Sequence, residues 1–339
     1  MTVIISVIMG VYNGEKYLDA AIKSILNQTF KNWEFIIIND GSTDGTSAIL
    51  KRYEEIEPRI KVYYQNNSGL AVCLNRGFEL ARGKYVAPMD DDDICLPERL
   101  AKAFAFMEAN PEVAICGGWH KTFGQFTSIE KYPIDYETIR CRLLFTTAFS
   151  QPTLLMRREM FVKANLSYDP AHKYCEDYGL WVKTSKLYPL ANLGEVLMLH
   201  RIHPAQVTQS RSIEQAAAGK PIRVAQLETL RIQPTAAEIE LHEALKVFTF
   251  PVDKDFIEQV DAWIHKLMAA NAKLLTYDEL ALAKILGQRW FFFCNTVTEL
   301  GWWTWETFWK SPVSKTANVS REDQLKFAVK CMVKRKRQF

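Results

Sequence analysis

Segments with the pattern of buried strands alternate with segments of helical pattern over about the first 110 residues. The strand-like segments are 3–9, 33–38, 60–64 and 85–89. Between them, apolar residues recur at helical spacing, as at Leu18, Ile22 and Ile25. This alternation predicts an α/β fold in which helices cover both faces of a mostly parallel sheet. Right-handed connections then place every loop that follows a strand at one edge of that sheet.

Four consecutive aspartates, residues 90–93, follow the fourth strand-like segment. At an effective dielectric constant of about 20, two like charges roughly 4 Å apart repel by about 4 kcal/mol. All four carboxylates can therefore be ionised together only if water solvates them or if they share a cation. A solvated acidic loop is the simpler interpretation, but ligands bind at the carboxyl ends of strands in open α/β sheets. Residues 12–13 and 40–42, which follow the first two strands, are expected at the same edge.

Neither common glycine-rich phosphate site occurs in the sequence. After the first strand the chain offers Gly10-x-x-x-Gly14 instead of the G-x-G-x-x-G of dinucleotide-binding folds. A P-loop needs four residues between its glycines, whereas Gly77 and Gly83 have five between them and lead into a strand. A crevice without such a site must neutralise a diphosphate in another way. A metal ion held by carboxylates supplies that charge.

The bulk composition limits the class of protein. A chain of 339 residues that is 48% hydrophobic is long enough for two domains. A net charge of +3 does not favour nucleic acid as a partner. The 7 cysteines are scattered without metal-ligand spacing, which indicates reduced thiols and a cytoplasmic location. We expect neither a signal peptide nor a membrane-spanning helix, since no window of about 18 apolar residues occurs.

A series of short phrases follows in order between residues 3 and 210. The phrases are Ser6-Val7-Ile8-Met9 with Tyr12-Asn13, Asn27-Gln28-Thr29-Phe30, Asn39-Asp40-Gly41-Ser42-Thr43-Asp44-Gly45-Thr46, Asn67-x-Gly69-Leu70 with Asn75-x-Gly77, Ala81-Arg82-Gly83, the aspartate tetrad with Pro97-Glu98-Arg99-Leu100, and Glu176-Asp177-Tyr178 with Trp181. Each phrase is weak alone, but together the series resembles glycosyltransferase family 2. The resemblance implies the GT-A fold, a nucleotide-sugar donor, and transfer with inversion at the anomeric carbon.

The resemblance also implies which residues bind the donor and its metal ion. Asp40 would accept a hydrogen bond from the uracil ring of a UDP-sugar, with Tyr12 beside the base. The other donor contacts that it implies are Asn13, Glu15, Gly69, Asn75, Asp90, Asp91 and Arg201. Asp92, with Asp90 and His203, would hold Mn²⁺ or Mg²⁺, although four identical residues leave the register of the D-x-D motif open. An exposed side chain is the simpler interpretation of the histidine and of the arginine.

The Glu176-Asp177 pair is the implied catalytic centre. Inverting transfer needs one carboxylate that removes the proton of the acceptor hydroxyl as its oxygen attacks. Asp177 aligns with this base, and Glu176 is the alternative. Acids in a first helical turn also complement the helix dipole, so helix capping is the competing interpretation of both residues.

A helical region, residues 213–339, is predicted to follow a GT-A domain at 1–212. Its last segment, 320–339, combines an apolar side with lysines and arginines, which favours peripheral contact with an anionic membrane at the inner face of the cell membrane. A helix docked on the protein with a solvated basic face is the alternative. The tryptophans between 302 and 309 fit a core contact, a homodimer contact or an interfacial belt at a membrane.

The predicted function is metal-dependent transfer of a single sugar from a UDP-sugar to a hydroxyl of a glycan or lipid-linked glycan, such as a lipopolysaccharide or capsule precursor. Residues 175–178, 199–203 and 206–208 look most like the β-1,3-N-acetylglucosaminyltransferases of lipooligosaccharide assembly. This likeness favours N-acetylglucosamine and leaves galactose and glucose open. A nucleotidyltransferase and a catalytically silent sugar-nucleotide-binding scaffold are the alternative functions.

Overall fold

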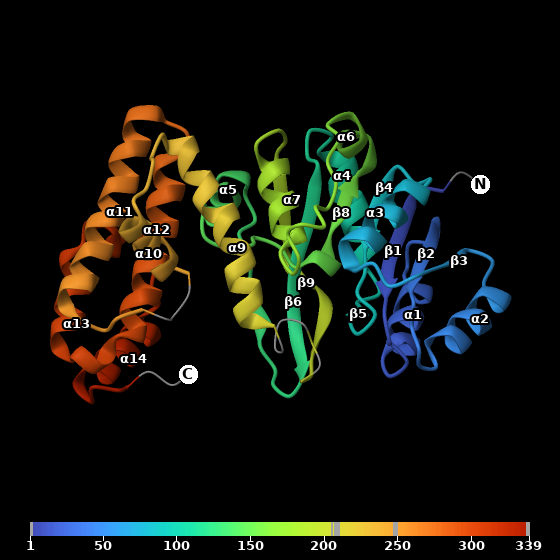
Figure 1. Ribbon diagram of the computed structural model, residues 1–339, viewed down its shortest axis with the longest axis horizontal. Helices are drawn as coiled ribbons and strands as arrows, with labels where there is room; N and C mark the ends of the chain where they lie inside the picture. Colours follow the sequence, from blue (N-terminus) through green and yellow to red (C-terminus); the bar gives the residue numbers. More distant parts are fainter. Residues whose placement is uncertain (1–2, 205, 207–210, 247–249, 337–339) are drawn as a thin grey trace. The chain divides into compact units, whose positions relative to one another are not determined.

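A computed structural model describes residues 3–204, 206, 211–246 and 250–336 of the chain (Figure 1). The chain divides into two compact units. Unit 1 comprises residues 1–139 and 147–219, and unit 2 comprises residues 140–146 and 220–339. The domain boundary expected at residue 212 stays a prediction. Residues 207, 208 and 337–339, which belong to segments interpreted above, lie outside the described residues.

Strands and helices alternate through the first half of the chain, and helices dominate the second half. The strands are β1 (Ile5–Val11), β2 (Trp33–Asp40), β3 (Ile60–Gln65), β4 (Tyr85–Pro88), β5 (Ile94–Cys95), β6 (Ile115–Gly124), β7 (Ile129–Glu130), β8 (Leu155–Arg157) and β9 (Leu190–Ile202). The α-helices are α1 (Leu18–Leu26), α2 (Thr46–Ile56), α3 (Leu70–Leu80), α4 (Arg99–Ala109), α5 (Tyr136–Leu143), α6 (Arg158–Lys163), α7 (Glu176–Ser185), α9 (Ser212–Gln226), α10 (Ala236–Ala244), α11 (Lys254–Leu274), α12 (Glu279–Thr296), α13 (Trp302–Lys310) and α14 (Arg321–Met332). The 3₁₀ helices are η1 (Gln151–Thr153), η2 (Leu227–Leu230), η3 (Thr298–Leu300) and η4 (Pro312–Thr316).

The sheet of unit 1 has the strand order β3-β2-β1-β4-β8-β6-β9-β5, with β7 added beside β6 (Figure 1). The first four strands in this order are parallel to one another. Every residue of β2 and nearly every residue of β1 is buried, as expected for strands that helices cover on both faces. The predicted α/β fold is therefore confirmed.

The other half of the sheet is mixed. β8 runs antiparallel to both of its neighbours, β4 and β6, and β5 runs antiparallel to β9. Ile94 pairs with Leu199 in that last ladder. Because the two strands run in opposite directions, the tetrad that precedes β5 lies beside the residues that follow Leu199.

Helices cover the two faces of the parallel strands differently. The odd-numbered residues of β1 share a core with α1, α2 and α4, which includes Ile22, Leu50 and Leu100. The even-numbered Ile8 faces α3, where Gly77 gives it room. A Cβ atom at Gly77 would lie only 3.1 Å from the Cβ atom of Ile8. Helices therefore pack closely on both faces of β1.

Unit 2 is a helical bundle (Figure 1). It has its own aromatic core. Trp263 donates from Nε1 to Nδ1 of the buried His242, 3.3 Å away, and His242 Nε2 lies 3.2 Å from the carbonyl oxygen of Leu144. Burial lowers the pKa of His242 to about 4, so this histidine is a neutral core residue. Across the part of the chain that the structure describes, no helix combines the length and apolarity needed to cross a bilayer.

Candidate active site

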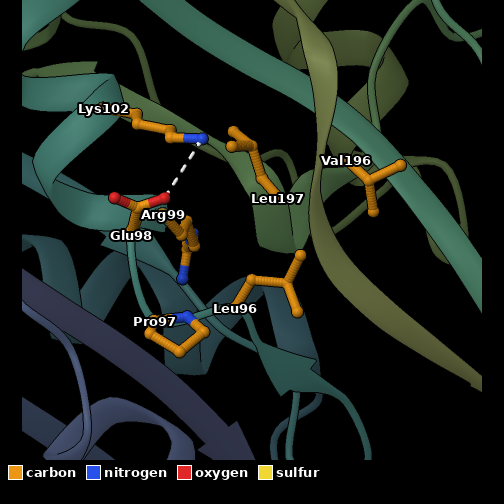
Figure 2. Close-up of a pocket in the computed structure, with 7 residues that line it drawn as sticks. All are labelled: Leu96, Pro97, Glu98, Arg99, Lys102, Val196 and Leu197. Carbon is orange, nitrogen blue, oxygen red and sulfur yellow. Dashed lines mark ion pairs between the residues drawn. The ribbon is translucent and has the colours of Figure 1, made fainter.

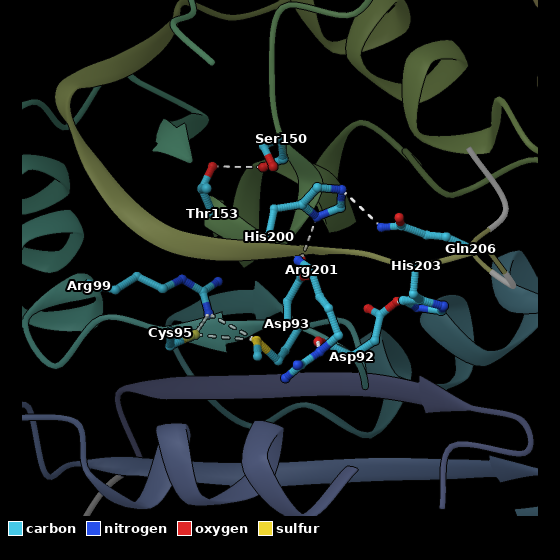
Figure 3. Close-up of polar contacts among 11 residues, drawn as sticks. Asp92, Asp93, Cys95, Arg99, Ser150, Thr153, His200, Arg201, His203 and Gln206 are labelled. Atoms are coloured by element: carbon cyan, nitrogen blue, oxygen red, sulfur yellow. Dashed lines mark hydrogen bonds and ion pairs between the residues drawn. The ribbon is translucent and has the colours of Figure 1, made fainter. Parts of the chain in front are cut away.

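A buried arginine fixes the chain on both sides of the aspartate tetrad. Arg99, the first residue of α4, donates from Nη2 to the carbonyl oxygens of Pro88 at 2.8 Å and Leu154 at 3.1 Å. Its Nη1 lies 2.9 Å from Sγ of Cys95, which follows the tetrad (Figure 3). The start and the end of the four-aspartate loop are therefore held at one point.

Two of the four aspartates bind side chains from the end of β9 (Figure 3). Asp93 is fully buried, and its carboxylate lies 2.9 Å from Nδ1 of His200 and accepts from the backbone N–H of Arg201 at 2.9 Å. Asp92 Oδ2 lies 3.0 Å from Nε2 of His203. The Asp92 carbonyl accepts from Nε of Arg201 at 2.8 Å. Adjacent aspartates thus face different partners, and which of them binds the metal ion stays a prediction.

The other two aspartates are short of positive charge. Burial, followed by repulsion from its acidic neighbours, raises the pKa of Asp90 well above its ordinary range. Burial and the charge of Asp92 raise the pKa of Asp91 to about 7. Such groups ionise readily only when a cation is nearby. The raised pKa values of Asp90 and Asp91 therefore favour the interpretation of the tetrad as a metal site over its interpretation as a solvated loop.

The loop after β1 leaves space for the carboxylate of Asp91. A Cβ atom at Gly14 would overlap with Asp91 Oδ2 and crowd the side chain of Val11. We therefore expect Gly14→Ala to displace Asp91 and to lower kcat/KM for sugar transfer at least tenfold. Gly194→Ala is the matched control, because its Cβ atom would come no closer than 3.7 Å to its nearest neighbour, Ile134 Cγ2. Equal activity of the two variants in a transfer assay would refute this assignment.

Asp40, the predicted partner of the nucleobase, ends β2 and is buried. Its carboxylate accepts from the backbone N–H groups of Ser68 and Gly69, both at 2.9 Å, and from Nε2 of Gln65 at 2.7 Å. These bonds position the start of α3 next to the end of β2. Asp40 and Gly69, two of the predicted donor residues, therefore lie together.

Asn13 and Glu15 join the loop after β1 to the loop after β2. Asn13 Oδ1 accepts from the backbone N–H of Thr43 at 2.8 Å, and Glu15 Oε2 accepts from that of Gly45 at 2.9 Å. Tyr12 beside them is exposed. One side-chain oxygen of each residue thus binds within the protein, and the predicted contact of Asn13 and Glu15 with the donor stays a prediction.

Asn75 on α3 binds the backbone that precedes α7. Its Nδ2 donates to the carbonyl oxygen of Tyr168 at 2.7 Å, and its Oδ1 accepts from the Tyr168 N–H at 2.9 Å. Burial, and then the charges of Asp177, Asp90 and Glu176, raise the pKa of the Tyr168 phenol. Tyr168 therefore marks the place where the tetrad and the start of α7 meet.

Both predicted base residues lie in the first turn of α7. Burial raises the pKa of Asp177 to about 6, although the N–H groups of Tyr178 and of Asp177 itself oppose this rise. Burial is also the main cause that raises the pKa of Glu176 to about 7. The N-cap residue of α7 is Cys175, and no side chain caps the helix there, so these acids complement the helix dipole only by their place in its first turn. The raised pKa of a carboxyl beside the acidic tetrad is typical of a general base.

The side chains present fit a hard cation that is bound together with a phosphate. Within the described residues, no three His, Cys, Asp or Glu side chains are grouped so that they could hold a metal ion alone. The pair of Asp92 and His203 offers one carboxylate and one imidazole. Mg²⁺ typically takes one or two carboxylates and completes its coordination with substrate phosphates and water. The predicted site therefore needs the diphosphate of the donor to be complete.

A pocket of about 220 Å³ at the start of α4 lies apart from these carboxylates (Figure 2). Its lining is Leu96, Pro97, Glu98, Arg99, Lys102, Val196 and Leu197. Lys102 is neutralised there by Glu98 at 3.3 Å and Glu195 at 2.6 Å. Because Lys102 is paired with two carboxylates and Arg99 already donates to the Pro88 and Leu154 carbonyls, we do not assign the diphosphate of the donor to this pocket.

Comparison with known proteins gives the family. The family model described as "Glycosyl transferase family 2" matches residues 6–164. An uncharacterized glycosyltransferase of Haemophilus influenzae is 34% identical over 232 residues, which are 65% of this chain and 72% of that protein. The chain belongs to glycosyltransferase family 2. The O-antigen biosynthesis glycosyltransferase WbnJ of Escherichia coli is 34% identical to this family 2 member over 217 residues, 61% of this chain and 82% of WbnJ.

The fold of this glycosyltransferase is also found in solved structures. Residues 1–349 of Staphylococcus aureus TarS, in complex with UDP-GlcNAc, match it with a TM-score of 0.58 at 20% identity, covering 84% of this chain and 86% of that one. The likeness concerns the fold alone and confirms the GT-A prediction. Family membership makes the chain a glycosyltransferase enzyme and decides against the nucleotidyltransferase and the silent scaffold.

Several residues that shape the site in this glycosyltransferase carry no local sequence signal. The guanidinium carbon of Arg201 lies 4.4 Å from the ring centre of Tyr17 and 4.5 Å from that of Phe123. Neither aromatic residue stands in a recognisable motif. Tyr168 also stands in no recognisable motif. The sequence does not indicate its role, because its partner Asn75 is 93 residues away. His200 and Asp93 stood in recognised phrases, but only the β5–β9 pairing identifies them as partners.

Proposed function

We propose that this glycosyltransferase moves one sugar from a UDP-sugar to a hydroxyl of a surface-glycan precursor, with inversion at the anomeric carbon and with Mn²⁺ or Mg²⁺ bound. N-acetylglucosamine is the favoured sugar, with galactose and glucose as alternatives. The observation that supports this most is the 3.0 Å contact of Asp92 with His203 in a partly buried acidic group. Burial first, and then the charges of the other aspartates and of Asp177, raise the pKa of Asp90 in that group. Metal-binding candidates and a candidate base thus share one site.

The acceptor class rests on the relatives. WbnJ is named for O-antigen biosynthesis, and O-antigen is a surface polysaccharide. TarS, which shares the fold, is described in complex with UDP-GlcNAc, which is compatible with a UDP-sugar donor here. The proposed acceptor is therefore a hydroxyl of a growing glycan, free or lipid-linked.

In the proposed donor site, Asp40 and the exposed ring of Tyr12 bind the uracil, and Asp90 and Asp91 contact the ribose or the sugar. Asp92 and His203 would hold the metal ion, which would supply positive charge beside the diphosphate. Arg201 is already held by the Asp92 carbonyl and by two aromatic rings, so we assign it to positioning of the tetrad as well as to a phosphate. Asn75 positions the Tyr168 segment and acts on the donor only indirectly.

In the proposed transfer step, Asp177 accepts the proton of the acceptor hydroxyl. The acceptor oxygen forms a bond to the anomeric carbon from the face opposite the diphosphate. The bond between that carbon and the diphosphate oxygen breaks, and UDP leaves with the electron pair. One proton moves to Asp177 and one glycosidic bond replaces one phosphoester bond, so the step balances without an oxidant or reductant.

The pH dependence of transfer follows from this role of Asp177. Only its ionised carboxylate accepts a proton, and burial raises its pKa to about 6. The ionised fraction is complete at higher pH and falls about tenfold for each pH unit below the pKa. We expect kcat/KM to fall in the same way as the pH is lowered from about 8 to 5. Circular dichroism is the control for unfolding. A level profile down to about pH 5 would contradict a base with this pKa.

A panel of UDP-sugars tests the proposed function as a whole. Release of UDP is measured for UDP-GlcNAc, UDP-galactose and UDP-glucose, with Mn²⁺ or Mg²⁺ and then with EDTA. We expect one donor to be hydrolysed or transferred at least tenfold faster than the others, and only with metal. If no UDP-sugar is turned over with either metal present, or if EDTA leaves the rate unchanged, the proposal is wrong.

A further inference from the structure

Helix α14 has apolar residues on two opposite sides. Phe327 and Cys331 are buried against unit 2. Leu325, Val329 and Met332 are 69%, 53% and 63% exposed. At 3.6 residues per turn these three residues lie on one face, about half a turn away from the two buried ones. Together with the exposed Val333 they form what we call the exposed ridge.

The buried side alone accounts for the attachment of α14 to unit 2. The ring of Phe327 lies 5.5 Å from that of Phe291, 5.5 Å from that of Trp305 and 5.6 Å from that of Phe308. Ser320 caps the helix by accepting from the N–H of Asp323 at 3.0 Å. The exposed ridge is therefore not needed to hold the helix in place, which leaves it open to another partner.

Positive charge accompanies the ridge. Residues 324–336 include Lys326, Lys330, Lys334, Arg335 and Lys336 and no acidic residue. Lys334 and Lys336 are exposed, as is Lys326, which pairs with Glu322 at 2.6 Å. An apolar partner with a negative surface complements this combination, and one with a positive or neutral polar surface does not.

Helix α13 lies against α14 and adds exposed tryptophan. Trp305 contacts Phe327, while Trp302 on the same helix is 48% exposed. Tryptophan is enriched where proteins enter the boundary between lipid headgroups and acyl chains. Amphipathic helices with lysine beside their apolar face bind the same boundary.

We propose that the exposed ridge and its lysines dock the enzyme on an anionic lipid bilayer. This inference is independent of the proposed donor and of the role of Asp177. It goes beyond the expectation of a basic tail, because the structure identifies which apolar residues are free of the protein core. The docked-helix alternative explains Phe327 and Cys331 but not the exposed ridge.

The first test is sedimentation of the full chain with large vesicles. One set contains phosphatidylcholine alone, and the other also contains about 30% phosphatidylglycerol, which gives a surface like that of an anionic leaflet. We expect at least tenfold tighter binding to the anionic set at low salt, and loss of that preference at high salt. Absence of binding to anionic vesicles at low salt would overturn the proposal.

Ridge variants test the apolar part. Leu325→Gln with Val329→Gln removes apolar surface without adding charge, and it should weaken vesicle binding at least tenfold without loss of folding, because both positions are exposed. Leu280→Gln is the control, since Leu280 is 80% exposed on α12 of the same unit. UDP release by each variant confirms that the enzyme is intact. Equal vesicle binding by the ridge variant and the control would overturn the proposal.

Charge variants test the electrostatic part. A lysine near an anionic surface contributes about fivefold to affinity, so replacing Lys326, Lys334 and Lys336 by Gln should weaken binding roughly 100-fold. Replacing the exposed Lys31, Lys51 and Lys61 of unit 1 removes the same charge and should have little effect. Equal loss in both triple variants would show non-specific attraction and contradict the proposed surface. Dimers in analytical ultracentrifugation that dissociate in the ridge variant would assign the ridge to a second copy and overturn it as well.

Discussion

Asp177→Asn is expected to abolish sugar transfer while leaving UDP bound. The amide cannot accept the acceptor proton, and a positioned general base contributes about 10²–10⁴-fold. We therefore expect kcat to fall about 1,000-fold, with the Kd of UDP in the presence of Mn²⁺ changed less than threefold. Steady-state transfer kinetics and isothermal titration calorimetry measure the two quantities separately. We place Asp177 at the reacting centre because its charge is among those that raise the pKa of Asp90 in the tetrad.

Glu176→Gln is the matched control, because it makes the same change in the same helical turn. Removal of its charge changes the field around Asp177 but leaves the proposed base in place. We expect a loss of less than tenfold for this variant. If Glu176→Gln loses more activity than Asp177→Asn, Glu176 is the base. If both variants lose UDP binding, the pair belongs to the donor site.

Asp92→Asn is expected to weaken Mn²⁺ binding in the presence of UDP by at least 100-fold. Asp92 offers a carboxylate oxygen beside His203 Nε2, and an amide oxygen is a poorer ligand for a hard cation. The rate of transfer should fall in parallel and recover in part at high Mn²⁺ concentration. Electron paramagnetic resonance of free Mn²⁺ gives the affinity directly. The fold should survive, because Asp92 is not fully buried.

Asp93→Asn separates metal binding from structural support. Asp93 is fully buried against His200 and the Arg201 backbone, so the loss of its charge should lower the free energy of unfolding by about 3 kcal/mol. We expect a clear fall in Tm for Asp93→Asn and little change for Asp92→Asn. The opposite result would be that Asp93→Asn loses Mn²⁺ binding with an unchanged Tm while Asp92→Asn binds Mn²⁺ normally. Asp93 would then be the metal ligand in place of Asp92.

The parallel half of the sheet was predictable because its signals are local. β1 and β2 are continuous apolar runs, and the helices between the strands show their buried face within a few residues. The mixed half was not predictable to the same extent. β8 has 3 residues, and β9 extends over 13 residues, from Leu190 to Ile202. Their order depends on pairing between segments far apart in the chain.

The candidate site shows the same limit. Charge alone identified the tetrad, and the order of phrases suggested Asp40 and Asp177. The sequence did not distinguish four identical aspartates, because their partners are set by the antiparallel register of Ile94 with Leu199. It also did not reveal that Asn75 holds the backbone of Tyr168. Side chains that act through distant contacts leave no periodic pattern.

Anomalous diffraction at the manganese edge, from crystals grown with UDP and Mn²⁺, tests the central claim most directly. We predict one strong peak within about 2.3 Å of a carboxylate oxygen of Asp92, with the UDP diphosphate on its other side. Asp177 should face the same space without touching the ion. A manganese peak bound by Asp93, or one away from residues 90–93, would contradict the proposed site.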